Sequence, residues 1–255
     1  MIGDMQKISY NSRVCHTLIV STFVLSMLLL SCDSEEYTYE KSRYEIAFED
    51  SIKTLLDNED DINNKNEEGF TPLYVATTQL YVDVVKTLLE NGADPNIPID
   101  LRGFTPLHGV MQHRLSDVLQ RKKEEMAIRL LIEHGAQVDA LDKNGDPPLS
   151  IAVRGGREDF CKLLIEHGAD VNYINRGYTP LHWAARFGYW KVVAVLITRG
   201  AAINMKTPKG ETSLFLAQER KFEIYYEEKR RSDKDFAKGA DYDRTIQILK
   251  QHGAS

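Results

Sequence analysis

The chain has 255 residues, of which 42% are hydrophobic and 27% are charged, and its formal net charge is −6 at pH 7. This length fits one long domain or two short ones. A nucleic-acid surface needs a sustained basic stripe, whereas the short basic runs at 121–123 and 229–231 each lie beside acidic residues, so we expect no nucleic-acid partner.

The three cysteines do not form a disulfide framework for the folded part of the chain. Cys15 and Cys32 lie in or at the edge of an apolar N-terminal segment, which leaves only Cys161 for the rest. Cys161 occupies a helical position that is Val85, Ile128 or Val193 in similar segments. We therefore interpret Cys161 as a small core residue.

The N-terminal segment has the pattern of a secretory signal. Lys7 and Arg13 precede an apolar run of thirteen residues at 18–30. A membrane-spanning helix needs about 20 such residues, so this run is too short to span a bilayer and has the length of a signal-peptide core. We predict that residues 1–31 are a signal peptide.

The end of this run, Leu29-Leu30-Ser31-Cys32, resembles the lipobox of bacterial lipoproteins. The resemblance implies acylation of the Cys32 sulfur, cleavage just before it and acylation of the new amine. The alternative is an uncleaved signal anchor, and both interpretations place the rest of the chain outside the cytoplasm. We expect a lipid anchor in the inner or outer membrane of a bacterial envelope, with the polar residues 32–42 as a tether. Asp33 resembles the inner-membrane retention signal of enteric bacteria.

A repeated pair of phrases runs through the remainder of the chain. The first phrase is Gly-x-Thr-Pro-Leu, present at 69–73, 103–107 and 177–181, with weaker forms at 145–149 and 210–214. The second phrase ends each unit on a Gly-Ala pair, at 92–93, 135–136, 168–169, 200–201 and 253–254. A fixed period near 33 residues indicates a stack of similar units.

Each unit predicts two helices. The threonine is a helix N-cap, the proline fits the first helical position, and the closing glycine favours the left-handed C-cap. Apolar residues at helical spacing, such as Val84, Val85, Leu88 and Leu89, mark the second helix. One such unit cannot bury its apolar face alone, so the units must stack.

These phrases resemble the ankyrin-repeat family, whose signature is Thr-Pro-Leu-His. The resemblance covers residues 43–255 and implies an all-α solenoid of helix-turn-helix repeats with short β-turn connections. A degenerate half-repeat precedes five repeats, and the predicted boundaries are 43–66 for the half-repeat and 67–98, 101–140, 143–172, 175–205 and 208–255 for the repeats. Repeats two and five are longer than the others, and we expect inserts at 114–123 and 222–241 between their two helices.

Several repeats depart from the family pattern. Tyr74 replaces the usual histidine in repeat one, Pro147 replaces the capping threonine in repeat three, and Ser213 replaces the proline in repeat five. These changes weaken individual helix starts but leave the fold prediction intact.

The histidines favour structural roles over metal binding. His134, His167 and His252 precede helix-ending glycines, where a cation is favourable, and His108 and His182 match the family histidine that braces the turns. We find no phosphate loop, serine nucleophile motif or zinc-protease motif. We therefore expect no enzyme activity, no cofactor and no metal.

The resemblance also suggests a binding face. In the ankyrin family, residues around the turn between repeats and late in the first helix line a concave face that binds proteins. In repeat four these positions and their neighbours hold Tyr173, Asn175, Arg176, Tyr178, Trp183, Arg186, Phe187 and Trp190. Tyrosine, tryptophan and arginine often anchor interfaces. Alternatively, Trp183 and Phe187 fill gaps between helices.

The predicted function is binding of another protein by a monomer. The alternatives are a periplasmic inhibitor or immunity protein that neutralises one toxin or enzyme, and an enzyme that uses the insert of repeat five. Architecture alone does not choose among them, because function depends on the chemistry of the site.

Overall fold

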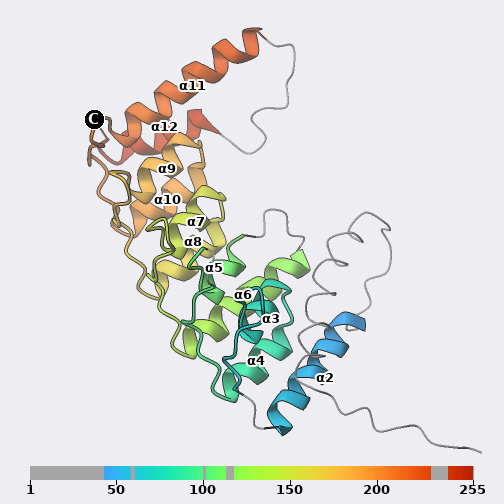
Figure 1. Ribbon diagram of the computed structural model, residues 1–255. Coiled ribbons are helices and arrows are strands. Elements are labelled where there is room, and N and C mark those ends of the chain that lie inside the picture. The colour runs from blue at the N-terminus through green and yellow to red at the C-terminus, as the bar shows by residue number, and fades with distance from the viewer. Residues whose placement is uncertain (1–42, 59–60, 100–101, 113–117, 231–240, 255) are drawn as a thin grey trace, which may run out of the picture.

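A computed structural model describes residues 43–58, 61–99, 102–112, 118–230 and 241–254, and for Arg43 and residues 226–230 it describes the backbone alone. The predicted signal peptide, the tether and Cys32 lie outside the described residues. Figure 1 shows the helices stacked in pairs along a gently curved column. None of the helices in the described part of the chain is both long and apolar enough to cross a membrane.

The helix pairs follow the repeat pattern of the sequence. In chain order the helices are α2 (Arg43–Asp57), α3 (Pro72–Thr78), α4 (Val82–Glu90), α5 (Pro106–Val110), α6 (Val118–Glu133), α7 (Pro148–Arg154), α8 (Glu158–Glu166), α9 (Pro180–Arg186), α10 (Trp190–Thr198), α11 (Ser213–Arg230) and α12 (Tyr242–Gln251). The described residues contain no β-strand beyond one isolated bridge between Asn175 and Tyr178. The predicted all-α solenoid is confirmed.

The threonine and proline of the repeat phrase begin the first helix of a repeat. The Thr71 hydroxyl accepts a hydrogen bond from the Tyr74 amide at 3.2 Å, and the Thr179 hydroxyl accepts one from the His182 amide at 3.3 Å. Pro72 and Pro180 occupy the first helical position, where no amide donor is needed. In repeat three, Pro147 stands at the N-cap and supplies no side-chain hydrogen bond.

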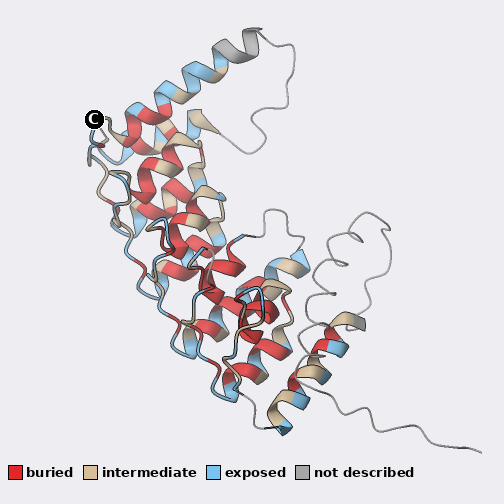
Figure 2. Cartoon of the chain, viewed as in Figure 1, coloured by how far each residue is buried: buried red, intermediate tan, exposed pale blue. Residues whose placement is uncertain are grey.

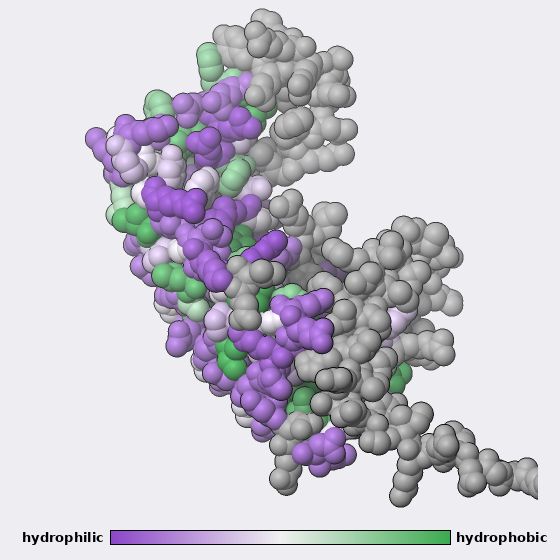
Figure 3. Space-filling model, in the orientation of Figure 1, coloured by the Kyte–Doolittle hydropathy of each residue, from purple (hydrophilic) through white to green (hydrophobic). Residues whose placement is uncertain are grey.

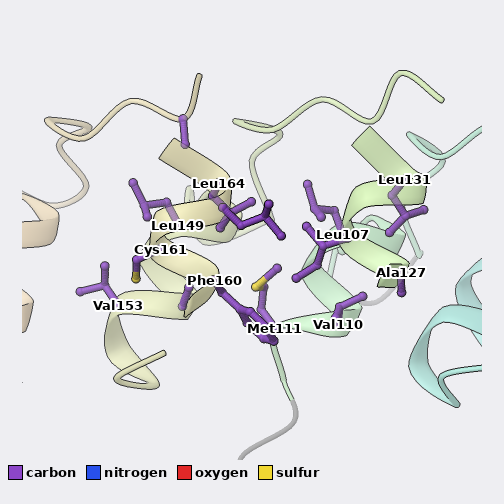
Figure 4. Packing of buried hydrophobic residues seen from close by; sticks show 14 of the residues in the cluster. Leu107, Val110, Met111, Ala127, Leu131, Leu149, Val153, Phe160, Cys161 and Leu164 are labelled. Atoms are coloured by element: carbon purple, nitrogen blue, oxygen red, sulfur yellow. The ribbon is translucent and has the colours of Figure 1, made fainter. Parts of the chain in front are cut away.

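The core is a column of leucines shared between neighbouring repeats. Leu107 and Leu149 from the first helices and Leu131 and Leu164 from the second helices are 0% exposed. Figure 4 shows these side chains from repeats two and three pointing toward one another, and Figure 2 shows buried residues along the whole stack. Burying each such side chain contributes about 1.5–3 kcal/mol, so the stability of one repeat depends on its neighbours.

Cys161 lies inside this column, as the sequence predicted. Its side chain is fully buried beside the apolar residues of α7 and α8. Burial raises the pKa of the Cys161 thiol well above its usual range, so the thiol is protonated at neutral pH.

The family histidines connect one repeat to the next. His108 accepts a hydrogen bond from the Thr105 amide at its Nδ1 atom (3.2 Å), and its Nε2 atom donates to the Asp146 carbonyl at 3.2 Å. His182 repeats this arrangement with Thr179 and with the Met205 carbonyl (2.9 Å). Both rings are fully buried, and burial lowers the pKa of each.

Tyr74, at the equivalent position of repeat one, makes an aromatic contact instead. Its ring stacks on Phe70 at 5.4 Å and packs in a small cluster with Ile99 and Phe104. Where His108 and His182 bond to the next repeat, Tyr74 therefore packs against apolar residues.

The two inserts are partly helical, which the sequence did not predict. In repeat two, residues 118–123 form the first turns of α6, and in repeat five α11 continues through residue 230. Figure 1 shows the far end of α11 projecting beyond the stacked pairs. The described parts of the two inserts, 118–123 and 222–230, are thus extensions of helices, while residues 114–117 and 231–240 lie outside the described residues.

The chain enters α12 through contacts with repeat four. The Asp241 amide donates to the Gly188 carbonyl at 2.9 Å, and the Tyr242 hydroxyl donates to the Arg186 carbonyl at 3.0 Å. These two bonds fix the start of α12 against the end of α9, so the second helix of repeat five keeps its place after the long insert.

Candidate protein-binding face

A tight hairpin turn forms the edge of repeat four. Asn175 and Tyr178 exchange backbone hydrogen bonds of 3.1 and 3.0 Å, and the two residues between them, Arg176 and Gly177, have φ values of +51° and +82°. Positive φ at both central residues is the signature of a type I′ turn. An arginine in this conformation costs roughly 1–2 kcal/mol relative to an ordinary one. The exposed Arg176 side chain is therefore held at the tip by a strained backbone.

Gly177 is required by the neighbouring hairpin. A side-chain carbon at position 177 would come within 2.3 Å of the Pro208 ring, which belongs to the hairpin of repeat five. The close approach shows that the tips of these two hairpins are packed against each other.

Four aromatic rings form a continuous row from the turn, along α9, to the start of α10. Tyr178 lies 5.0 Å from Trp183, Trp183 lies 5.9 Å from Phe187, and Phe187 lies 5.7 Å from Tyr189, measured between ring centroids. All four are half-buried. Trp183 and Tyr189 also pack against the hydrophobic core. Each ring is thus partly buried and partly accessible to solvent. Contacts between neighbouring rings restrict the rotation of these side chains.

Arg176 and Arg186 lie close in the chain to rings of this row. Arg176 precedes Tyr178 in the turn, and Arg186 is the last residue of α9, beside Phe187. The Arg186 side chain is half-buried while that of Arg176 is exposed. We call the set Arg176, Tyr178, Trp183, Arg186 and Phe187 the repeat-four patch.

The other three candidates from the sequence lie around the patch. Asn175 donates to the Asp146 carboxylate at 2.7 Å and to the Asn144 carbonyl at 3.2 Å, so its amide joins repeats three and four. Trp190 begins α10, and the Arg244 guanidinium of α12 lies 4.9 Å from its ring. Tyr173 is half-buried and precedes the hairpin.

The negative charge of a buried carboxylate next to the turn, that of Asp146, is balanced by an arginine within the protein. Arg154 holds Asp146 with two hydrogen bonds of 2.9 and 2.8 Å, and Asn175 adds a third. Burial acts to raise the pKa of Asp146, but these bonds and the nearby Arg154 and Arg176 charges lower it overall. Asp146 therefore stays ionised at neutral pH and is paired with Arg154 inside the protein, while Arg176 is exposed.

Tyr189 belongs to the row but was not among the sequence candidates. It stands at the N-cap of the second helix, and Tyr81 and Arg157 hold the corresponding position in repeats one and three. A recurring tyrosine before the second helix was the available signal. Its place beside Phe187 depends on how the two helices of repeat four turn back on each other, which the sequence pattern does not specify.

The repeats of the chain are similar to those of known proteins. A family model of ankyrin repeats in three copies matches residues 44–121, 99–175 and 115–207. Neurogenic locus notch homolog protein 1 of Xenopus tropicalis and of Homo sapiens are each 36% identical to it over 157 residues, which is 61% of this chain and 6% of those proteins. An ankyrin repeat protein of Acanthamoeba polyphaga mimivirus is 41% identical over 108 residues, which is 39% of this chain and 18% of that protein. The matched stretch is thus a small part of these relatives.

Three observations agree: the repeated Thr-Pro-Leu phrase, the stacked helix pairs joined by hairpin turns, and the match of the family model to most of the described residues. Repeats of this kind generally bind other proteins. The chain belongs to the ankyrin-repeat family.

Proposed function

We propose that this protein binds one protein partner through the repeat-four patch while a lipid on Cys32 holds it to a bacterial membrane, with the repeats outside the cytoplasm. The observation that supports the binding site is the row of contacting rings of Tyr178, Trp183 and Phe187, with Arg176 and Arg186 close to it in the chain. Aromatic and arginine side chains supply most interface hot spots.

The patch is preorganised, which favours binding. Its rings contact one another, Trp183 is anchored in the core, and the turn that carries Arg176 is fixed by paired backbone hydrogen bonds. Side chains that are already ordered lose little conformational entropy when a partner binds. A small number of residues can then provide most of the affinity.

Capture of the partner tests the site. We expect wild-type protein to retain a specific protein from solubilised membranes, and the Tyr178→Ala, Arg186→Ala variant to lose it while its thermal transition changes little. The matched control is Tyr225→Ala with Arg199→Ala, which removes the same two residue types from the exposed part of α11 and from the end of α10. Capture that persists in the first variant, or that fails equally in the control, would remove the patch as the binding site.

The anchor has a separate test. Replacing Cys32 by alanine removes the thiol that a lipobox requires, so the variant should move to the soluble fraction and lose labelling by a clickable palmitate. If the variant remains in the membrane fraction, the N-terminal segment is an uncleaved anchor instead. A single acyl chain binds membranes weakly, whereas the three chains of a mature lipoprotein would anchor the protein firmly.

A further inference from the structure

The hairpin tips of repeats two to five carry a row of positive charges. Arg102, Arg176 and Lys209 each immediately precede the turn glycine of their repeats, and all three are exposed. Lys143 lies two residues before the turn glycine of repeat three, and Lys206 lies near the tip of repeat five. We call these five residues the basic ridge.

Contacts between neighbouring hairpins make the ridge continuous. The Lys143 amide donates to the Arg102 carbonyl at 2.9 Å, which joins the tips of repeats two and three. Asn175 bonds the Asn144 carbonyl and joins repeats three and four, and Gly177 packs on Pro208 and joins repeats four and five. The five cations therefore lie along one ordered edge of the stack.

The described carboxylates of these hairpins face inward or are bonded. Asp142 accepts backbone hydrogen bonds from Asn144 and Asp146, and Asp146 is paired with Arg154. Glu211 is half-buried and accepts from the Thr207 hydroxyl at 3.0 Å. In repeat one the residue before the turn glycine is the exposed Glu68, so the ridge begins at repeat two.

Four cations of the basic ridge are not used for ion pairs with the described part of the stack. Among the residues that the structure describes, Arg102, Arg176, Lys206 and Lys209 make no salt bridge. Arg176 in addition occupies a left-handed backbone conformation, where strain is an indication of function. The positive charge of this edge contrasts with the net charge of the whole chain, which is −6.

We infer that the basic ridge binds an extended acidic segment of the protein partner, with one acidic residue opposite each repeat. This inference rests on the proposed protein-binding function and extends the contact beyond repeat four. Packed helix layers lie about 8–10 Å apart, so four tips span roughly 30 Å. A polyproline II segment advances about 9 Å for every three residues. Acidic residues at every third position therefore match the spacing of the tips.

At the repeat-five end of the basic ridge, a hollow can accommodate an apolar residue of the acidic segment. A hollow of about 500 Å³ opens between the hairpin of repeat five and α11, and Lys206, Lys209, Leu214 and Phe215 are among the residues that line it. Phe215 is 48% exposed, although the corresponding residue of repeat four, His182, is fully buried beneath the next hairpin. The exposed ring beside two lysines suits an acidic segment that ends on an apolar side chain.

The test uses the full-length protein in a nonionic detergent and a fluorescent peptide of twelve residues. The peptide carries glutamate at every third position with proline and alanine between, and the comparison peptide has the same composition with its four glutamates consecutive. We expect the spaced peptide to bind at least threefold more tightly at low salt, and its affinity to fall as salt is raised. Equal binding of the two peptides would overturn the proposed spacing.

Charge-reversal variants locate the contact on the ridge. Arg102→Glu with Lys209→Glu should weaken binding of the spaced peptide at least tenfold, whereas Lys86→Glu with Lys162→Glu, on the outer helices α4 and α8, should change it less than twofold. Arg102→Gln with Lys209→Gln provides a milder pair if the reversals unfold the protein. Equal loss in both charge-reversal pairs would mean that net charge alone attracts the peptide, and the proposal would be wrong.

Two further measurements separate this proposal from others. Anionic phospholipid vesicles or a single-stranded oligonucleotide that competes as well as the spaced peptide would make the ridge a general polyanion surface and would overturn it. If partner capture depends on Tyr178 and Arg186 but not on Arg102 and Lys209, the proposed function stands and the ridge proposal fails. If neither pair affects capture, the proposed function fails as well.

Discussion

At the scale of single residues, the most informative side chains hold repeats together. His108 and His182 each bond back to a threonine of their own repeat and forward to a carbonyl of the next. The sequence pattern predicted this bracing role from the family signature. It could not identify the forward acceptors, Asp146 and Met205, because these lie 38 and 23 residues further along the chain.

The two histidines predict a pH dependence of stability. Burial places their folded-state pKa values below the usual value of about 6.5. At pH 7 both rings are neutral in the folded and unfolded chains. As pH falls below about 6.5 the unfolded chain gains protons before the folded chain does, so the free energy of unfolding decreases.

The measurement is urea unfolding at pH 7.5, 6.5 and 5.5. We expect wild-type stability to decline across this range and the His108→Gln, His182→Gln variant to show a shallower decline from a lower starting value. Losing a buried hydrogen bond costs about 1–3 kcal/mol, which sets the expected drop at pH 7.5. An unchanged slope in the variant would assign the titration to other groups.

Asn175 shows what a residue pattern leaves out. Its place beside the turn made it a candidate for partner contact, yet its amide bonds Asp146 and Asn144 of the preceding repeat. A polar residue in a hairpin can face a partner or the neighbouring hairpin equally well. The distinction depends on the geometry between repeats, which the sequence of one repeat does not contain.

At the scale of elements, the repeat spacing reflects the size of the hairpins. The backbone-paired turn spans 66–70 in repeat one and 99–104 in repeat two, and this extra residue accounts for the 34 residues between Thr71 and Thr105. In repeat four it contracts to 175–178, which is one residue shorter than 142–146 in repeat three. Spacing variations that looked irregular in the sequence are therefore changes in turn length, and the helices keep their register.

Helix α11 is the element that the sequence predicted least well. The first helix of repeat five was expected to end before residue 222, but it continues to Arg230. The residues involved are charged or aromatic apart from Ile224, and they include no proline or glycine, so nothing in 222–230 stops a helix. When repeat five is aligned with the shorter repeats, these residues have no counterpart and are assigned to an insert. The alignment shows that the repeat is longer, but it does not show whether the extra residues are helical.

Deletion of residues 224–240 tests whether the far end of α11 supports the fold. Phe222 and Tyr225 are 62% and 60% exposed, and the contact between Lys221 and Asp243 remains after the deletion. We expect the midpoint of thermal unfolding, followed by circular dichroism, to change by only a few degrees. Leu249→Ala is the comparison, because Leu249 is fully buried and its truncation should cost about 2–5 kcal/mol. A deletion as damaging as Leu249→Ala would mean that this part of α11 packs against the stack.

At the scale of the whole molecule, stacking creates surfaces that no single segment contains. The sequence showed no basic stripe, since Arg102, Arg176 and Lys209 are separated by dozens of residues. The solenoid brings them to one edge because each occupies a similar position at the tip of its repeat. Figure 3 shows one face of the molecule, on which hydrophilic residues predominate and hydrophobic areas are small.

The fold and the surface chemistry were therefore predictable to different degrees. Capping residues and helical periodicity are local signals, and they were sufficient for the repeats and for the core position of Cys161. The aromatic row and the basic ridge depend on distances between repeats. Of the candidates at the binding face, Tyr178, Trp183 and Phe187 lie together, while Trp190 contacts Arg244 of repeat five.

Binding of the partner by the repeat-four patch is tested by measuring the dissociation constant of the captured protein. The constant should rise at least tenfold, about 1.4 kcal/mol, in Tyr178→Ala with Arg186→Ala, with the thermal transition retained. The control, Tyr225→Ala with Arg199→Ala, should bind like wild type. A constant that changes less than twofold in the folded patch variant would mean that the binding site lies elsewhere on the solenoid.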